Sequence, residues 1–167
     1  MDCVNIQLVI MQNKLNIIDT TLRDGAQSPL MFDTKKYFFS LEDKKEIVKA
    51  LVALGVKYIE FFSPIVSEIE KEHFLEIKKY IKYLENSSDV KLLAHARLHE
   101  SDIKSVIDAG FDGINLYIGT SNESINNNHK KDLDSIIGLA KDILPGIQNN
   151  FSHIWFSGED AFRTSND

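Results

Sequence analysis

The sequence predicts an α/β fold built on a parallel β-sheet with crossover helices. Short runs rich in β-branched and aromatic residues alternate with amphipathic segments of helical period along the 167-residue chain, and this alternation is typical of βαβ units. Charged and polar residues gather just after these runs, at the edge where parallel sheets carry their functional sites.

The first half of the chain contains two predicted strands and two predicted helices. Ser40 can cap the start of the first helix and Gly55 can close its end. The apolar run YIEFF is typical of a buried strand. The elements expected here are a strand from Leu15 (LNIIDTT), a helix over 40–55, a strand over 58–62 and a helix over 68–85.

The second half continues the same alternation and ends on a strand. Pro145-Gly146 is expected to bend or end the last helix, since proline lacks an amide proton. A loop is expected at Asn126–Asn128. The elements expected here are strands over 91–98, 113–120 and 153–157, and helices over 100–110 and 131–144.

Composition excludes several classes of protein. The chain is 43% hydrophobic and 26% charged, which is typical of a globular domain. Its net charge of −6 argues against a nucleic-acid partner. The single cysteine, Cys3, excludes a disulfide framework and is typical of a reducing compartment. The first apolar run, residues 8–11, is too short for a signal peptide or membrane span, so we expect a cytoplasmic protein without membrane association.

Five strands fit either an open doubly wound sheet or part of a closed barrel. A nucleotide-binding sheet predicts a glycine-rich turn after the first strand, but LRDG stands at residues 22–25 and no G-x-G-x-x-G occurs. A TIM (β/α)8 barrel takes about 250 residues. The residues alone leave both folds open.

The polar residues at the strand ends are the candidate site. Arg23 and Asp24 form either a local structural pair or part of a site. Glu60, inside an apolar strand, needs a cation or hydrogen-bond donors if it is buried. His95 and His99 do not predict a metal pair, because their spacing spans a strand end and a loop. The remaining candidates are Arg97, Thr120, Ser121, Ser157, Glu159 and Asp160, the last two of which can also cap a following helix.

The segment IIDTTLRDGAQSP, residues 17–29, resembles the signature of the metal-dependent Claisen-condensing enzymes. These are the isopropylmalate, homocitrate and citramalate synthases, with hydroxymethylglutaryl-CoA lyase as a more distant relative. Four further segments are similar in the same order, and the last is most similar to the homocitrate branch. They are YIEFFSP (58–64), LLAHARLH (92–99), GFDGINLYIGTS (110–121) and FSGEDAFR (156–163).

The resemblance implies a fold, a reaction and a set of site residues. The fold is a TIM barrel of which residues 1–167 supply about the first five βα units, as the N-terminal part of one catalytic domain with residues 1–14 as a short extension. The reaction joins acetyl-CoA to a 2-oxo acid with a divalent metal (Mg, Mn or Zn). Asp24 would bind the metal, and Arg23 would stabilise the keto oxygen. The other implied residues are Glu159 (catalytic) and Gln27, Glu60, His95, Arg97, Thr120 and Ser157 (substrate-binding).

Three departures from the family's pattern bear on these expectations. The family's other metal ligands are a His-x-His pair on the seventh strand, and no His-x-His occurs in this sequence. Trp155 stands where the homocitrate branch has an arginine for the distal carboxylate of 2-oxoglutarate, which argues for a less charged substrate. Asn115 replaces an acid on the fourth strand, and Ala26 replaces a common glutamate.

Two other functions stay open. The first is a lyase that runs the reverse carbon–carbon cleavage, although the LRDGAQSP and FSGED segments favour a synthase. The second is a non-catalytic fragment, or half of a split enzyme completed by a partner chain or by a second copy. We expect the 167-residue chain to be inactive on its own.

Overall fold

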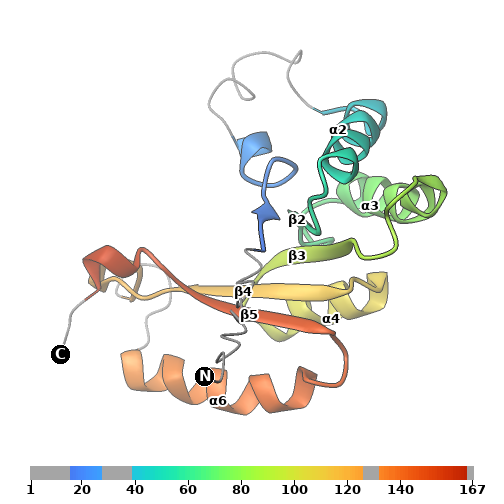
Figure 1. The fold of residues 1–167 in the computed structure, drawn as a ribbon. Helices are drawn as coiled ribbons and strands as arrows, with labels where there is room; N and C mark the ends of the chain where they lie inside the picture. Colours follow the sequence, from blue (N-terminus) through green and yellow to red (C-terminus); the bar gives the residue numbers. More distant parts are fainter. Residues whose placement is uncertain (1–15, 28–38, 126–131, 165–167) are drawn as a thin grey trace, which may run out of the picture.

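The fold is a single parallel sheet with its strands in sequence order (Figure 1). The computed structural model describes residues 16–27, 39–125 and 132–164. Each strand pairs in parallel with the next one along the chain, and a helix stands between them, as in successive βα units of a TIM barrel. The strands are β1 (Ile18–Asp19), β2 (Tyr58–Phe62), β3 (Lys91–Arg97), β4 (Gly113–Gly119) and β5 (His153–Glu159).

Polar caps set the starts of the crossover helices. Ser40 and Asp43 form a capping box, and the side chain of Ser67 accepts a hydrogen bond from the Glu70 amide. Gly110 ends a helix at φ +74°, a conformation that suits glycine. The crossover helices are α2 (Leu41–Ala53), α3 (Glu68–Tyr80), α4 (Glu100–Ala109) and α6 (Leu133–Ile147). The short helices are η1 (Gly25–Gln27), η2 (Ile81–Tyr83), α5 (Asn122–Ser124) and η4 (Ala161–Arg163).

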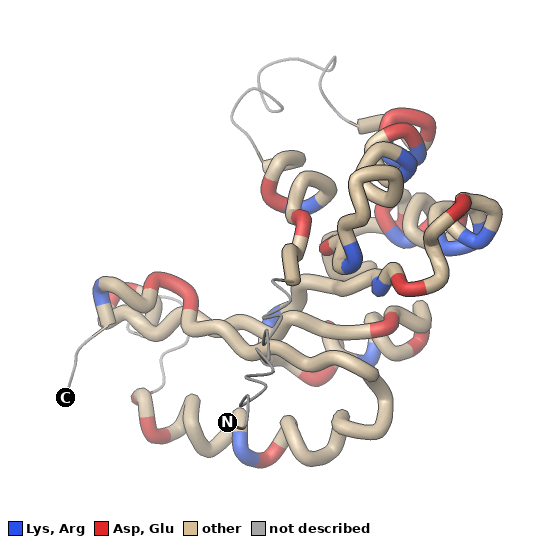
Figure 2. The backbone as a smooth tube through the Cα atoms, in the orientation of Figure 1, with Lys and Arg blue, Asp and Glu red and all other residues tan. Residues whose placement is uncertain are grey.

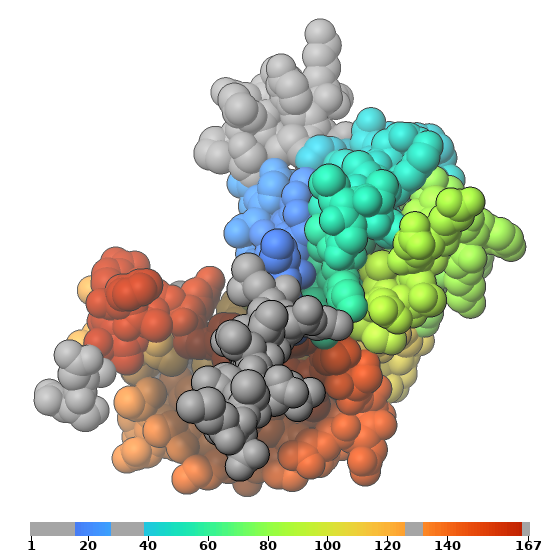
Figure 3. All heavy atoms as spheres, in the orientation of Figure 1, coloured from blue at the N-terminus to red at the C-terminus, as the bar shows by residue number. Residues whose placement is uncertain are grey.

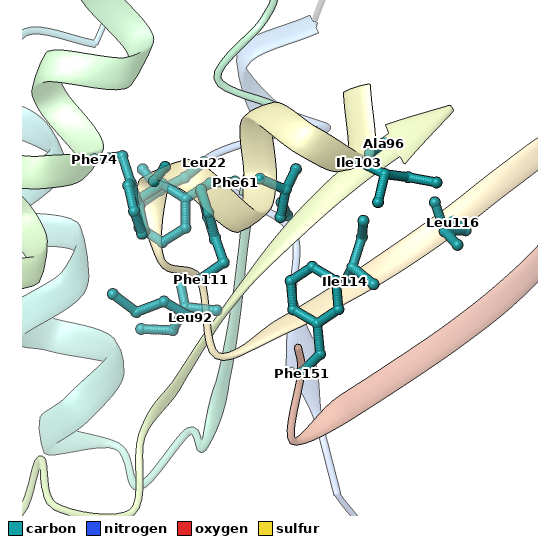
Figure 4. Packing of buried hydrophobic residues seen from close by; sticks show 14 of the residues in the cluster. Leu22, Phe61, Phe74, Leu92, Ala96, Ile103, Phe111, Ile114, Leu116 and Phe151 are labelled. Atoms are coloured by element: carbon teal, nitrogen blue, oxygen red, sulfur yellow. The ribbon is translucent and has the colours of Figure 1, made fainter. Parts of the chain in front are cut away.

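The hydrophobic core lies between the sheet and the helices (Figure 4). Phe61 of β2 packs edge-on against Phe74 of α3 at 5.5 Å between ring centroids, and Phe74 stacks on Phe111. Ile114 of β4 is also fully buried. Burying each such side chain contributes about 1.5–3 kcal/mol, so this layer is the main support of the strands.

The opposite face of the sheet curls inward. Tyr58 of β2 contacts His153 and Trp155 of β5, with ring centroids 5.2 and 5.5 Å apart. In a flat sheet these strands would lie about 14 Å apart, so the contacts require the curvature of a closing barrel. At Gly113 an added Cβ would lie 2.7 Å from the His153 carbonyl oxygen, which explains the glycine at this close approach of β4 and β5.

Several boundaries differ from the prediction, and β1 covers only Ile18–Asp19 of the strand expected from LNIIDTT. The helix expected over 68–85 breaks into α3 and η2, and β5 runs to Glu159 instead of ending at 157. Pro145 lies inside α6 and does not end it at 144, because a proline in the last turn removes only one helical hydrogen bond. Asp160 precedes η4 but makes no capping bond with its side chain. Leu15, residues 1–14, Ser28-Pro29, Asn126–Asn128 and Lys131 lie outside the described residues.

Charge is distributed unevenly over the helices (Figure 2). Acidic and basic side chains crowd α2 and α3, whereas α6 carries few and exposes Ile137. Within the described ranges, no helix is long and apolar enough to cross a membrane.

Candidate active site

The turn after β1 presents Arg23 and Asp24 at the carboxyl end of the sheet. Asp19 accepts hydrogen bonds from the amide and hydroxyl of Thr21, which tightens the turn. The amides of Arg23 and Asp24 both donate to the Thr20 carbonyl. Leu22 is only 1% exposed, so it anchors the turn in the core while its neighbours face the site.

Arg23 is held by a buried carboxylate. Glu60 is fully buried in β2, and its Oε1 accepts a hydrogen bond from Nε of Arg23 at 2.9 Å. One terminal nitrogen of Arg23 forms an ion pair with the same oxygen at 2.8 Å. The other terminal nitrogen of Arg23 donates to Asp24 Oδ1 at 2.6 Å. A guanidinium has five N–H groups, and two of them are used in these hydrogen bonds, so donors remain for a ligand. Arg23 and Asp24 therefore form a local pair, and Arg23 links this pair to the buried Glu60.

A hydrogen-bond chain across the sheet fixes Glu60. Asn115 of β4 donates through Nδ2 to Glu60 Oε2 at 2.8 Å, and its Oδ1 accepts from Ser157 of β5 at 3.1 Å. The cation and donors expected for a buried Glu60 are thus Arg23 and Asn115. The sequence pointed to Ser157 as a site residue but gave Asn115 no role. Asn115 could have been found from its position two residues before Tyr117, which places both side chains on the same face of β4.

His95 of β3 lies beside this chain. Its Nδ1 is 3.7 Å from Glu60 Oε2 and, among the described residues, has no hydrogen-bond partner. Its ring stacks on Tyr117 at 4.3 Å, nearly parallel. Burial lowers the pKa of His95 and outweighs the attraction of Glu60, which favours the neutral imidazole. Burial also raises the pKa of Tyr117.

A pocket of about 350 Å³ opens beside these residues. Arg97 lines this pocket. Its guanidinium donates two hydrogen bonds to Asp102, at 2.8 and 2.9 Å, and these bonds raise the pKa of Arg97. The buried Asp102 is a partner that the sequence analysis missed. The full lining is Arg23, Gln27, Phe62, Ser63, Ile65, Val66, His95, Arg97, Asp102 and Tyr117.

Thr120 and Glu159, two of the predicted site residues outside the pocket lining, lie at the β5 end of the sheet. Thr120 bonds to the carbonyl of Glu159 at 3.3 Å and to Thr164 at 2.7 Å, and Glu159 is exposed. Figure 3 shows the η4 end of the chain well separated from the β1 segment. Trp155 belongs to the aromatic group with Tyr58 and His153, deeper on the same sheet face.

The described residues do not form a metal site by themselves. They include no group of three or more His, Cys, Asp or Glu side chains arranged to hold an ion. Asp24, whose side chain is 60% exposed, supplies one carboxylate, and Arg23 already occupies its Oδ1. His99 caps α4, where its Nδ1 accepts from the Ser101 amide at 3.3 Å, and it does not pair with His95.

Comparison with known proteins shows matches over almost the whole chain. The chain is 34% identical over 152 residues to the mitochondrial homocitrate synthase of Schizosaccharomyces pombe, covering 91% of this chain and 34% of that protein. It is 35% identical to the cytosolic homocitrate synthase isozyme of Saccharomyces cerevisiae, covering 91% and 33%. It is 30% identical to the 2-isopropylmalate synthase of Sulfurisphaera tokodaii, covering 96% and 39%. The chain spans about a third of the length of these relatives.

A solved structure and a family model complete the comparison. Hydroxymethylglutaryl-CoA lyase from Pseudomonas aeruginosa superposes with a TM-score of 0.60 at 17% identity, covering 86% of this chain and 45% of that one. This likeness shows the fold, a partial TIM barrel. The model of the HMGL-like family matches residues 14–167. Together with the order of the strands, this match shows that the chain belongs to the HMGL-like family.

Proposed function

We propose that this chain carries the arginine-bearing half of the active site of an acyltransferase that condenses acetyl-CoA with a 2-oxo acid. The observation that carries the proposal is Arg23, presented at the end of β1 by a fully buried Glu60. The family match and the synthase relatives support the same reaction.

Arg23 suits the charge that this reaction creates. When the acetyl-CoA enolate attacks the keto carbon, the keto oxygen becomes an alkoxide and needs fixed donors. Glu60 and Asp24 each accept a hydrogen bond from Arg23, and Glu60 also forms an ion pair with it, which orients the fork while N–H groups remain for that oxygen. The orientation is set before substrate arrives, so little reorganisation is needed during the reaction.

The neighbouring side chains shape the rest of the site. Gln27 and His95 line the pocket next to Arg23. A neutral imidazole can accept or donate a hydrogen bond to a substrate carboxylate or hydroxyl without adding charge. We propose that both residues orient the 2-oxo acid, with Asn115 and Ser157 acting through Glu60.

The test is product analysis. The chain is mixed with a polypeptide carrying the last three βα units of a homocitrate synthase relative, and CoA release from acetyl-CoA is followed with a panel of 2-oxo acids. We expect release that depends on the 2-oxo acid, with a hydroxy di- or tricarboxylic acid as product. Cleavage of hydroxymethylglutaryl-CoA instead would support the lyase. A complex that forms but does neither would refute the proposal.

A further inference from the structure

Another pocket lies at the opposite edge of the sheet from Arg23. Its volume is about 540 Å³, a size typical of small-molecule sites. Its walls come from the end of α3, from η2 and from the loop that leads to β3. Lys91 begins β3 and Asp112 directly precedes β4, so the pocket lies at the amino ends of these strands. A ligand in this pocket would therefore not take part in chemistry at Arg23.

Basic side chains dominate the lining of this pocket. Lys78, Lys82 and Lys91 line it together with one carboxylate, that of Asp112, so the lining carries a net charge of +2. The Asp112 carboxylate is already bound, because its Oδ2 accepts a hydrogen bond from the Leu92 amide at 2.9 Å. The lining therefore has an excess of positive charge that its own carboxylate does not balance.

Lys78 is compensated by backbone carbonyls and not by a carboxylate of the described residues. Its side chain is half-buried, and Nζ donates to the carbonyl oxygens of Ala109 and Gly110 at the end of α4. The carboxyl end of a helix supplies only about half a unit of negative charge, so part of the ammonium charge remains for an anion. A half-buried charge is also screened less than an exposed one, which strengthens its attraction for that anion.

Two acids in the loop between η2 and β3 lie outside the lining. Asp89 pairs with Lys57 at 3.5 Å, and Glu85 is exposed. Water and salt screen exposed charges of this kind. These acids therefore weaken the attraction for an anion but do not occupy the pocket.

Neutral donors and an apolar surface complete the pocket. Asn86 has φ +62°, a left-handed conformation that asparagine tolerates and that turns the loop. Asn86 and Ser88 both line the pocket and carry side-chain donors. Ile81, which is buried, and Leu84, which packs against the core, supply the apolar part of the lining. The pocket thus offers charged and neutral donors beside an apolar surface.

We infer that this pocket binds a phosphate monoester whose ester group is apolar. A phosphate monoester carries a charge of about −1.5 to −2 at pH 7 and three strong acceptor oxygens, which match the net charge of the lining and its several donors. A carboxylate has one charge and two oxygens, and so matches them less well. The apolar ester group would cover Ile81 and Leu84. The inference concerns a second site and does not depend on the function proposed above.

The experiment measures binding of three probes to the 167-residue chain. The ¹⁵N-labelled chain is titrated at low salt with phenyl phosphate, inorganic phosphate and phenol, and the amide shifts of residues 81–92 report occupancy. We expect phenyl phosphate to bind at least about threefold more tightly than either of the other probes, because it alone uses both the lysines and the apolar surface. Added NaCl should weaken the binding of phenyl phosphate and leave that of phenol unchanged.

A matched pair of variants tests the role of the lysines. Lys82 is exposed and lines the pocket, so we expect Lys82→Ala to weaken the binding of phenyl phosphate by about two- to fivefold. Lys79 lies three residues earlier, outside the pocket, and pairs with Glu76 at 2.7 Å. Lys79→Ala should leave the binding of phenyl phosphate unchanged. Both lysines lie at the surface, so neither substitution removes a core contact.

Each other outcome overturns the inference in a recognisable way. If phenyl phosphate does not shift residues 81–92, the pocket is not a phosphate site. If inorganic phosphate binds as tightly as phenyl phosphate, the apolar surface has no role and the inferred class of ligand is wrong. If Lys79→Ala weakens binding as much as Lys82→Ala, the anion is attracted to the helix surface and not to the pocket. None of these outcomes affects the proposed acyltransferase function, which is tested by CoA release.

Discussion

At the scale of single residues, Arg23 carries the sharpest prediction. A lysine keeps the charge but offers one nitrogen, which cannot contact Glu60, Asp24 and a substrate oxygen together. In the completed enzyme we expect Arg23→Lys to lower turnover at least about tenfold with little change in the free energy of unfolding. Arg163→Lys is the matched control, because Arg163 is exposed and, among the described residues, pairs with the nearby Asp160. Wild-type turnover in Arg23→Lys would remove Arg23 from the reaction.

His95 gives a prediction about pH. Burial lowers its pKa, so between the folded and unfolded pKa values the unfolded chain binds more protons. The contribution of His95 to stability is therefore present above about pH 6.5 and is lost as the pH falls below it. Burial lowers the pKa of His73 in the same direction, so the comparison is with His95→Phe, which keeps the stack on Tyr117.

The measurement for His95 is direct. An NMR titration of the His95 ring should give a midpoint below about 6.5, and the free energy of unfolding should fall more steeply on acidification in the wild type than in His95→Phe. A midpoint at or above the ordinary histidine value would contradict both expectations.

At the scale of elements, a buried ion pair joins α2 to α3. Lys44 Nζ contacts both oxygens of Glu70, at 2.6 and 2.7 Å. The Lys44 side chain is 3% exposed, against 26% for Glu70. Removing the carboxylate leaves an ammonium with no access to water, whereas removing the ammonium leaves a carboxylate that is partly hydrated.

Removing the Glu70 carboxylate should therefore lower the free energy of unfolding more than removing the Lys44 ammonium. We expect Glu70→Gln to lower the free energy of unfolding by about 2–4 kcal/mol and Lys44→Met by about 1–2 kcal/mol. Glu76→Gln, which breaks an exposed pair with Lys79 in the same helix, should cost less than about 1 kcal/mol. Chemical denaturation of the three variants gives the order, and the reverse order for the first two would show that burial does not set the cost.

The sequence predicted the ends of some helices but not the contacts between distant strands and helices. Local signals in the sequence predicted the start of α2 at Ser40 and the end of α4 at Gly110, because capping depends on residues that are adjacent in the sequence. The sequence also required a partner for Glu60 but could not name Asn115, 55 positions away. That pairing depends on how far the sheet curls, which no local pattern encodes. Likewise, the sequence could not identify Asp102 as the partner of Arg97, because that contact depends on where α4 begins relative to Arg97.

At the scale of the whole molecule, we expect the 167-residue chain alone to release no CoA from acetyl-CoA with any 2-oxo acid. A catalytic metal site takes about three protein ligands, and the described residues arrange no such group. In the part of the chain that the structure describes, the sheet also ends at β1 and β5, so we expect water to reach the site and weaken its electrostatics. Release by the lone chain that depends on metal and 2-oxo acid would contradict this expectation.

The order of the strands also sets how easily each part of the sheet opens. β3 and β4 are each paired on both sides through at least five residue pairs a side, whereas β1 joins β2 through two residue pairs. Amide hydrogens should therefore exchange slowest in β3 and β4 and fastest in β1, as local opening starts at the weakest edge. Arg23 follows that edge strand directly, so a ligand bound to its guanidinium would slow exchange in residues 18–24 before any change reaches the centre of the sheet.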